Sequence, residues 1–242
     1  MTAVLITRPE PDAAHFAQLC RDAGLEPIMS PLMEPVIGAA PVDLTDVAAL
    51  AFTSANGVRA FAANSGRRDL PVFAVGSATA AAAKSVGFRQ VSAADGDVDS
   101  LARLISRRPS TGVTLHIAGT RRSGDLIALL EKEKHPARRA VLYEMNEADA
   151  LPAPAVKALT TPSQVLWVTL FSPRTTALFM RLIENAGLEN SLGRANAACL
   201  SDAVAELLPS EKWARVFVAP EREANSMIEL ITAHLEGGPR PA

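Results

Sequence analysis

A short pattern that occurs twice restricts the fold of this chain more than any other part of its sequence. An apolar run, a polar turn with Ser or Thr, and a segment with helical apolar spacing follow one another at Leu50–Phe61 and again at Val168–Phe179. The run indicates a buried parallel strand, and the spacing after the turn indicates a helix. Ser54 and Ser172 hold equivalent places in the two copies. Each copy therefore puts a hydroxyl and free helix N–H groups at the carboxyl end of a strand, where open α/β sheets bind ligands and anions are favoured.

Apolar runs alternate with helical patterns along almost the whole chain, which favours parallel sheets with helices on both faces. The elements expected within Val4–Ile105 correspond one by one to those expected within Val113–Ile231, so the chain is internally duplicated. Duplication is compatible with two sequential lobes, and equally with an exchange in which the first two strands join the last three. A short helix is expected at Asp43–Val47, and disorder is expected in the tail Gly237–Ala242.

The composition excludes several classes of protein. Hydrophobic residues make up 48% of the chain and the formal net charge is −2, so there is no basic footprint for nucleic acid. No apolar run is long enough to span a membrane, and the apolar start is too short for a signal peptide, so we expect a cytoplasmic protein. The cysteines and histidines show no metal-ligand spacing, and no nucleotide-binding or hydrolase motif is present. The sequence therefore gives no sign of a nucleotide site, a metal site or a triad hydrolase.

Hydroxyl side chains and arginines stand at the expected strand-to-helix turns, and each type has two interpretations. Any one hydroxyl can cap its own helix without a ligand, whereas the whole set is expected to converge on the carboxyl ends of both sheets. The hydroxyl residues are Thr53, Ser54, Ser77, Thr79, Ser172 and Ser201. A guanidinium can hold a carboxylate through two hydrogen bonds, although isolated surface arginines are also common. The arginines at these turns are Arg8, Arg121, Arg122 and Arg174.

Several short motifs follow one another in a fixed order. They are Thr7-Arg8-Pro9, Pro31, Phe52–Val58, Ala74–Ala80, Gly87-Phe88, Val141–Glu144 and Phe171–Arg174. No single motif is specific, but with this order and spacing the chain resembles the uroporphyrinogen-III synthase family over essentially its whole length. The resemblance implies an α/β fold of two flavodoxin-like lobes with parallel sheets, joined by a two-stranded linker. It implies that residues 1–36 and 150–242 form one lobe, and that residues 37–149 form the other.

The resemblance also implies a reaction that needs no cofactor. Hydroxymethylbilane, a linear tetrapyrrole, loses water, inverts its last pyrrole ring and closes to uroporphyrinogen III in heme biosynthesis. Its acetate and propionate groups suit a cleft of anion-binding strand ends. The residues expected to bind this substrate stand at the strand-to-helix turns and are Arg8, Thr53, Ser54, Asn56, Gly57, Ser77, Thr79, Gly119, Arg121, Arg122, Ser172, Arg174 and Ser201. We expect the protein to act as a monomer on this small molecule, without a metal, nucleic acid or membrane.

Tyr143 is the only tyrosine of the chain and the candidate catalytic residue. It ends the expected strand Ala140–Tyr143 beside the polar, extended segment Glu144–Ala150, which is expected to be the second linker. A phenol can serve as the weak acid that assists departure of the hydroxyl, while the pyrrole nitrogen supplies much of the push. The alternative is a tyrosine that packs at a strand end with its hydroxyl in water.

One segment departs from the family pattern. Leu200-Ser201-Asp202-Ala203 stands where the family's second repeat often has a Gly-x-x-Thr-Ala turn. A carboxylate facing an anionic substrate would repel it, so we expect Asp202 to cap its own helix. The departure keeps a second function open, namely a non-catalytic two-lobed protein that binds or senses tetrapyrroles or carboxylates on the same fold.

Overall fold

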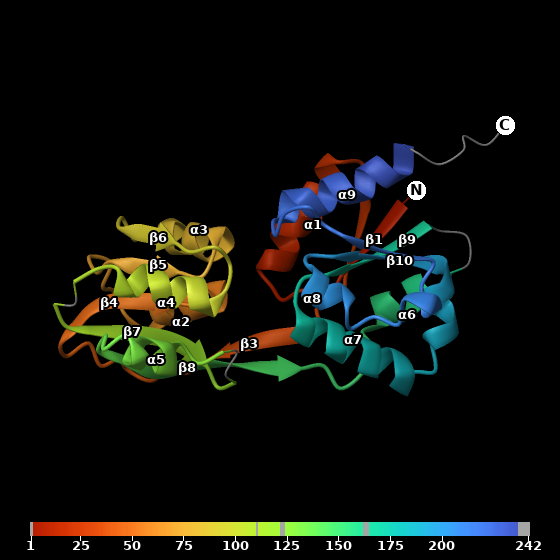
Figure 1. Ribbon diagram of the computed structural model, residues 1–242. Helices are drawn as coiled ribbons and strands as arrows, with labels where there is room; N and C mark the ends of the chain where they lie inside the picture. Colours follow the sequence, from red (N-terminus) through yellow and green to blue (C-terminus); the bar gives the residue numbers. More distant parts are fainter. Residues whose placement is uncertain (1, 110, 122–123, 162–164, 237–242) are drawn as a thin grey trace. The chain divides into compact units, whose positions relative to one another are not determined.

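The computed structural model describes residues 2–109, 111–121, 124–161 and 165–236, and in it strands alternate with helices (Figure 1). The strands are β1 (Thr2–Ile6), β2 (Glu26–Met29), β3 (Met33–Ile37), β4 (Val47–Phe52), β5 (Val72–Ala74), β6 (Val91–Ala93), β7 (Val113–Gly119), β8 (Ala137–Glu147), β9 (Val165–Leu170), β10 (Ala195–Cys199) and β11 (Arg215–Val218). The α-helices are α1 (Asp12–Asp22), α2 (Ala55–Asn64), α3 (Ser77–Ser85), α4 (Val98–Ser106), α5 (Leu126–Lys132), α6 (Ala153–Thr160), α7 (Pro173–Asn185), α8 (Asp202–Ala205) and α9 (Ala224–Glu236). Two short 3-10 helices, η1 (Glu189–Arg194) and η2 (Ser210–Lys212), precede β10 and β11, respectively.

Contacts between residues divide the chain into two compact units. Unit 1 comprises Met1–Glu34 and Asn146–Ala242, and unit 2 comprises Pro35–Met145. The boundaries fall inside β3 and β8, which pair with each other in the sheet of unit 2. The Gly38 N–H donates to the Leu142 carbonyl at 2.8 Å, and the Ala148 N–H donates to the Leu32 carbonyl at 2.9 Å. Because partner numbers fall on one strand as they rise on the other, β3 and β8 run antiparallel and form the two-stranded connection.

The sheet of unit 1 contains strands from both ends of the chain. Its order is β11-β10-β9-β1-β2, and all neighbouring strands are parallel. Numbered in chain order within the unit, this is the flavodoxin-like order 2-1-3-4-5. The apolar run Ala3–Ile6 is fully buried in β1, as a parallel strand covered on both faces must be. Phe16 of α1 and Met227 of α9 pack together with Val4 and Trp167 against one face, whereas α6 and α7 lie across the sheet from them (Figure 1).

The sheet of unit 2 has the same spatial order in a permuted chain. Its order is β3-β8-β7-β4-β5-β6, and the strands from β8 to β6 run parallel. Taking β7 and β8 as the first two strands of the second repeat again gives 2-1-3-4-5. The predicted fold class is therefore confirmed: two parallel flavodoxin-like sheets arise from a duplicated chain whose repeats exchange their first two strands.

Alternation along β4 explains why its sequence is an unbroken apolar run. Leu50 and Phe52 face one layer, where they pack with Phe61 of α2, whereas Ala49 and Ala51 face the layer of α4 and α5. Successive side chains of a strand point to opposite faces, so a strand between two helical layers must be apolar at every position. In the part of the chain that the structure describes, no helix is long and apolar enough to cross a membrane.

Local structure differs from the sequence prediction in three places. The helix expected at Asp43–Val47 is wrong, because the Asp43 carboxylate accepts the Thr45 N–H at 2.9 Å and makes a turn that leads into β4. That hydrogen bond and the neighbouring Arg138 hold the pKa of Asp43 well below its usual range. The helix α6 was not expected. The helix expected to begin at Asp202 is only the four-residue α8, shorter than the Asp202–Leu208 that its apolar spacing predicts. The tail that we expected to be disordered lies outside the described residues.

Candidate functional site

Unit 2 carries a cavity where the strand order of its sheet reverses. The chain runs outward from β4 to β5 and in the other direction from β7 to β8, so the reversal lies between β4 and β7. Open α/β sheets bind ligands at the carboxyl ends of strands at such a point. The cavity has a volume of about 330 Å³. Its walls include the predicted site residues Thr53, Ser54, Gly119, Arg121 and Tyr143, which the fold thereby brings together.

The ring of Tyr143 packs on the bare backbone of Gly119. These two residues are register partners in β7 and β8, beyond an irregularity between Ala118 and Gly119, and the Thr120 N–H donates to the Tyr143 carbonyl at 3.0 Å. A Cβ atom on Gly119 would lie 2.9 Å from Cε2 and 3.0 Å from Cζ of Tyr143. The ring can therefore lie over the strand end in the cavity wall only because position 119 has no side chain.

Ser54, Asn56 and Gly57 build the start of α2. Ser54 is its N-cap, and the Ser54 hydroxyl oxygen accepts the Asn56 N–H at 3.2 Å. The Asn56 side chain accepts from Arg59 at 2.8 Å, and a Cβ on Gly57 would lie 3.0 Å from the Ile117 carbonyl oxygen. Asn56 thus stabilises the first turn of α2, and Gly57 allows this helix to approach β7 closely. Neither residue lines the cavity.

The remaining hydroxyls are more scattered than the sequence predicted. Ser77 lies in the first turn of α3, and Thr79 is buried two residues further into that helix, so neither borders the cavity. Ser201 is the N-cap of α8, and Asp202 is the exposed first residue of that helix, so the expectation that Asp202 is the cap is wrong. Arg122 lies outside the described residues.

His116 is a cavity residue that sequence reasoning missed. Its Nε2 lies 3.2 Å from Oγ1 of Thr53, and only 7% of the residue is exposed. Burial, followed by the nearby positive charge of Arg139, lowers the pKa of His116 to about 4, against a smaller opposing effect of Asp125. The imidazole is therefore neutral near pH 7 and can exchange one hydrogen bond with Thr53. The available signal was a histidine in the mainly apolar strand Val113–Ala118.

Arg139 is a second residue that sequence reasoning missed. It lies on β8 directly opposite His116. Its Nη2 donates to the Gly119 carbonyl, and also to the Thr120 carbonyl at 3.2 Å. Arg139 therefore fixes the turn that follows β7, including Gly119, on whose backbone the Tyr143 ring packs. The strand was expected to start only at Ala140, so Arg139 was not considered part of the sheet.

The buried state of His116 predicts a specific loss of stability in acid. Its pKa is about 4 in the folded protein against a usual 6.5, so the unfolded chain binds the proton more readily. The contribution of neutral, buried His116 to stability is fully present above about pH 6.5 and is lost as the pH falls toward 4. This loss is on the order of 3 kcal/mol in the free energy of unfolding. We expect His116→Gln to flatten this part of the profile in urea unfolding at pH 7 and pH 4.5. His135, whose pKa burial also lowers, contributes in the same direction and remains in both proteins. Parallel profiles for parent and variant would contradict the assignment.

Unit 1 has its own reversal point, between β1 and β9. The Thr7 hydroxyl donates to the Thr169 carbonyl at 2.8 Å and thereby ties the two strand ends together. The Arg8 guanidinium lies 4.3 Å from the centre of the Phe171 ring and makes an ion pair of 3.4 Å with Asp12. Ser172 is the N-cap of α7 and its hydroxyl oxygen accepts the Thr175 N–H at 3.2 Å, so it repeats the role of Ser54 in unit 2.

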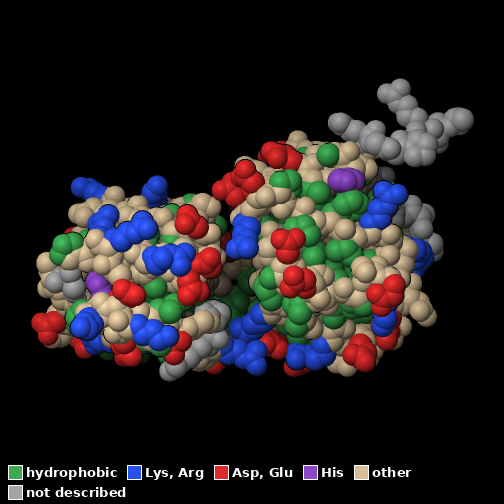
Figure 2. Space-filling model, in the orientation of Figure 1, with side chains coloured by type: hydrophobic (Ala, Val, Ile, Leu, Met, Phe, Trp, Pro, Cys, Tyr) green, Lys and Arg blue, Asp and Glu red, His purple; other side chains and the backbone are tan. Residues whose placement is uncertain are grey.

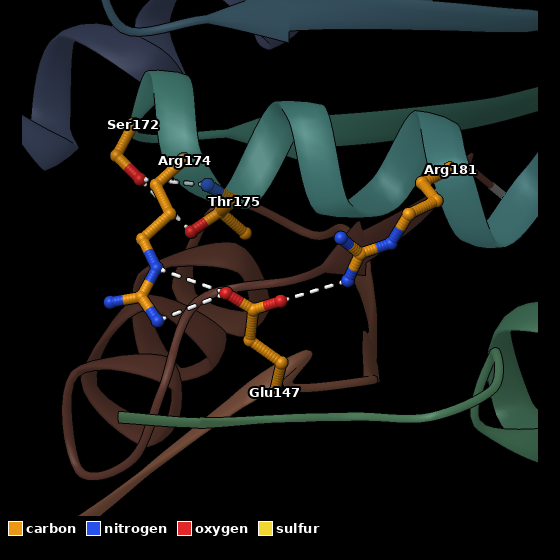
Figure 3. A network of polar contacts seen from close by, with 5 residues as sticks. All are labelled: Glu147, Ser172, Arg174, Thr175 and Arg181. Atoms are coloured by element: carbon orange, nitrogen blue, oxygen red, sulfur yellow. Dashed lines mark hydrogen bonds and ion pairs between the residues drawn. The ribbon is translucent and has the colours of Figure 1, made fainter. Parts of the chain in front are cut away.

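Arg174 contacts a carboxylate of the chain itself (Figure 3). Its Nη2 lies 3.0 Å and its Nε 3.3 Å from Oε1 of Glu147. The other carboxylate oxygen accepts from Arg181 at 2.8 Å. Glu147 and Arg181 were not among the sequence candidates. The predicted cations thus include two, Arg8 and Arg174, that already make ion pairs within unit 1.

Charges and metal-binding side chains elsewhere do not mark a second site among the residues described. On the face drawn in Figure 2, basic and acidic side chains are interspersed over both units, so attraction of an anionic ligand to this face rests on local groups. Among the residues described, no three His, Cys, Asp or Glu side chains are grouped so that they could hold a metal ion. Both cysteines, Cys20 and Cys199, are buried free thiols whose pKa burial raises to about 12.

These features define a class: duplicated α/β proteins with two exchanged flavodoxin-like sheets and polar residues at the reversal point of each sheet. A family model described as uroporphyrinogen-III synthase HemD matches residues 14–229, and the chain belongs to this uroporphyrinogen-III synthase family. The family is one of cyclising lyases in heme biosynthesis.

Two solved structures have the same fold. The uroporphyrinogen-III synthetase of Helicobacter pylori 26695 is 16% identical, with a TM-score of 0.65 over 96% of this chain and 99% of that one. A mutant uroporphyrinogen III synthase of the extremely thermophilic bacterium Thermus thermophilus is 18% identical, with a TM-score of 0.54 over 98% of this chain and 100% of that one. No curated protein matches the chain significantly.

Proposed function

We propose that this protein cyclises hydroxymethylbilane to uroporphyrinogen III, with Tyr143 assisting the departure of the hydroxyl and the reversal points of the sheets holding the carboxylates. The observation that carries the proposal is the cavity in which Tyr143, Thr53 and Arg121 meet at the carboxyl end of the unit 2 sheet. The direct test mixes the protein with enzymatically generated hydroxymethylbilane and analyses the uroporphyrin isomers after oxidation. Type III in clear excess over the spontaneous type I supports the proposal, and type I alone rejects it.

The chemistry of the step makes modest demands on the protein. The pyrrole nitrogen expels the hydroxyl, which leaves as water once it has received a proton. The last pyrrole ring then attacks the resulting cation with the carbon that already carries its bridge to the chain. That bridge bond breaks and forms again at the free α-carbon of the same ring, which loses a proton, so the ring is inverted in the closed product. Tyr143 is the proposed proton donor, because a phenol is a weak acid that can act within hydrogen-bond reach. His116 is not assigned this role, since its pKa of about 4 leaves it without an extra proton near pH 7. We assign to it a hydrogen bond that holds the Thr53 hydroxyl.

The proposed cations should act on binding more than on the chemical step. We expect alanine at Arg8, Arg121, Arg122 or Arg174 to raise KM, with a smaller change in kcat. The rise in KM should correspond to about 1–3 kcal/mol of binding free energy, the worth of the lost charged hydrogen bonds. Arg67→Ala is the matched control, because Arg67 is an exposed arginine that is paired with Asp69 and follows the C-terminal end of α2, away from the strand-to-helix turns. Steady-state kinetics of the isomer-resolved reaction give both constants. Four variants with the KM of the control would remove these arginines from the site.

Three further assignments complete the proposal. The functional lobes are residues 1–36 with 150–242, and residues 37–149, and the enzyme acts as a monomer in the cytoplasm. Light scattering coupled to size exclusion measures the mass directly. The non-catalytic alternative that the Ser201-Asp202 segment left open gains no support from the family match or from the solved structures.

A further inference from the structure

Two arginines of α7 share one carboxylate (Figure 3). Arg174 and Arg181 are seven positions apart, which is close to two helical turns, so both side chains leave the same face of the helix. Glu147, at the end of β8, reaches that face and gives Oε1 to Arg174 at 3.0 Å and Oε2 to Arg181 at 2.8 Å. A single carboxylate is thus held at both oxygens by two guanidinium groups of one helix.

The contact is open to solvent and therefore exchangeable. The side chains of Arg174, Glu147 and Arg181 are 32%, 25% and 57% exposed. Ion pairs at such exposures contribute little to stability, because water and salt compete for both partners. The arrangement nevertheless has the geometry in which guanidinium groups recognise carboxylates. It shows that the face of α7 accepts a carboxylate, and the exposure of these ion pairs allows a second carboxylate to compete for the same guanidinium groups.

We propose that Arg174 and Arg181 form a carboxylate-binding subsite, and that Glu147 occupies it until a carboxylate of the ligand takes its place. The inference rests on the proposed function in one respect, since it takes the ligand to be a polycarboxylate tetrapyrrole. It extends the site to Arg181, and it gives Glu147 the role of a built-in competitor that sets ligand affinity.

A purely structural role for Glu147 makes the opposite prediction. If the ion pairs served only to fasten the end of β8 to α7, or to hold Arg174 in its binding rotamer, removal of the carboxylate would loosen the site and weaken binding. If Glu147 competes with the ligand, its removal takes away a competitor for the guanidinium groups of Arg174 and Arg181 and strengthens binding. The sign of the change in affinity therefore separates the two roles, whatever its size.

The experiment measures the Kd of uroporphyrin III, the stable oxidised form of the proposed product, from its fluorescence during titration with protein. We expect Glu147→Gln to lower this Kd about two- to fivefold, which corresponds to the usual worth of such an ion pair. Glu147→Asp keeps the charge but shortens the arm by one methylene, so it should also lower the Kd. Arg181→Gln should raise the Kd about three- to tenfold through the loss of a charged hydrogen bond at a half-exposed position.

Asp149→Asn is the matched control for charge alone, because it removes an exposed carboxylate two residues along the chain. A decrease in Kd of the same size in this variant would mean that general repulsion, and not occupancy, is responsible. The proposal is overturned by a Glu147→Gln protein that binds uroporphyrin III no tighter than the parent, or by an Arg181→Gln protein that binds it equally well. The isomer assay decides the proposed function separately, so a protein that forms no type III isomer can still pass or fail this binding test.

Discussion

A Tyr143→Phe protein should form uroporphyrinogen III with a kcat about 10²- to 10⁴-fold below that of the parent and with little change in KM. The phenol acts mainly as the hydroxyl leaves, so its loss removes stabilisation of the transition state and not of the bound substrate. We expect the lower end of this range, because the pyrrole nitrogen supplies much of the push. Single-turnover conversion of hydroxymethylbilane measures the chemical step without interference from product release.

Thermal unfolding is the control for this variant. Phe keeps the ring that packs on Gly119 and loses only the hydroxyl, so the fold should survive. A variant that folds normally and forms the type III isomer at the parent rate would show that Tyr143 is a packing residue. Catalysis would then rest on the positioning of the curled substrate alone.

The second large effect is expected at Gly119, which has no side chain to take part in the chemistry. In a Gly119→Ala protein the new Cβ would lie 2.9 Å from Cε2 of Tyr143, so the ring must move away from the strand end. A misplacement of about 1 Å in a catalytic group can cost about 10²-fold in rate, and we expect a decrease in kcat approaching this size. The same assay measures it.

Gly66→Ala is the matched control, because a Cβ there meets no atom within 4 Å. The effect of Gly119→Ala should largely disappear in a Tyr143→Phe background, since it acts through the phenol. Independent, additive losses in the double variant, or an unchanged kcat in Gly119→Ala, would contradict the link between the two residues.

The buried parallel strands were predictable from their pattern, whereas the exchange of strand pairs followed from the family resemblance, since duplication alone also allowed two sequential lobes. β4 and β9 are apolar at nearly every position since helices cover both of their faces, and each runs directly into a Ser-capped helix. α6 was missed for the opposite reason. It is only eight residues long, and Pro152 and Pro154 stand at its start, where proline is well tolerated.

The site was predictable only where function coincides with a turn motif. Thr53 and Ser54 directly follow β4 and could be found from the turn motif. Tyr143 was found as the single tyrosine of the chain, although it lies within β8 and does not end the strand as expected. His116 and Arg139 face each other across β7 and β8, and this relation depends on strand register, which the sequence does not state. Glu147 is paired with arginines 27 and 34 positions along the chain. Contacts of this kind follow from tertiary packing and leave no local pattern.

The exchange of strands also determines the order in which the two units can fold during synthesis. Unit 2 is one continuous segment and can fold as soon as it leaves the ribosome. β1 cannot, because its second neighbour is β9, and Thr2 is in register with Val165. At about 5–20 residues per second, the fully apolar strand Ala3–Ile6 waits roughly 10–30 s with one edge unpaired. An exposed apolar edge is a template for wrong pairing, so the nascent N-terminus is the part of this chain most in need of protection by a chaperone.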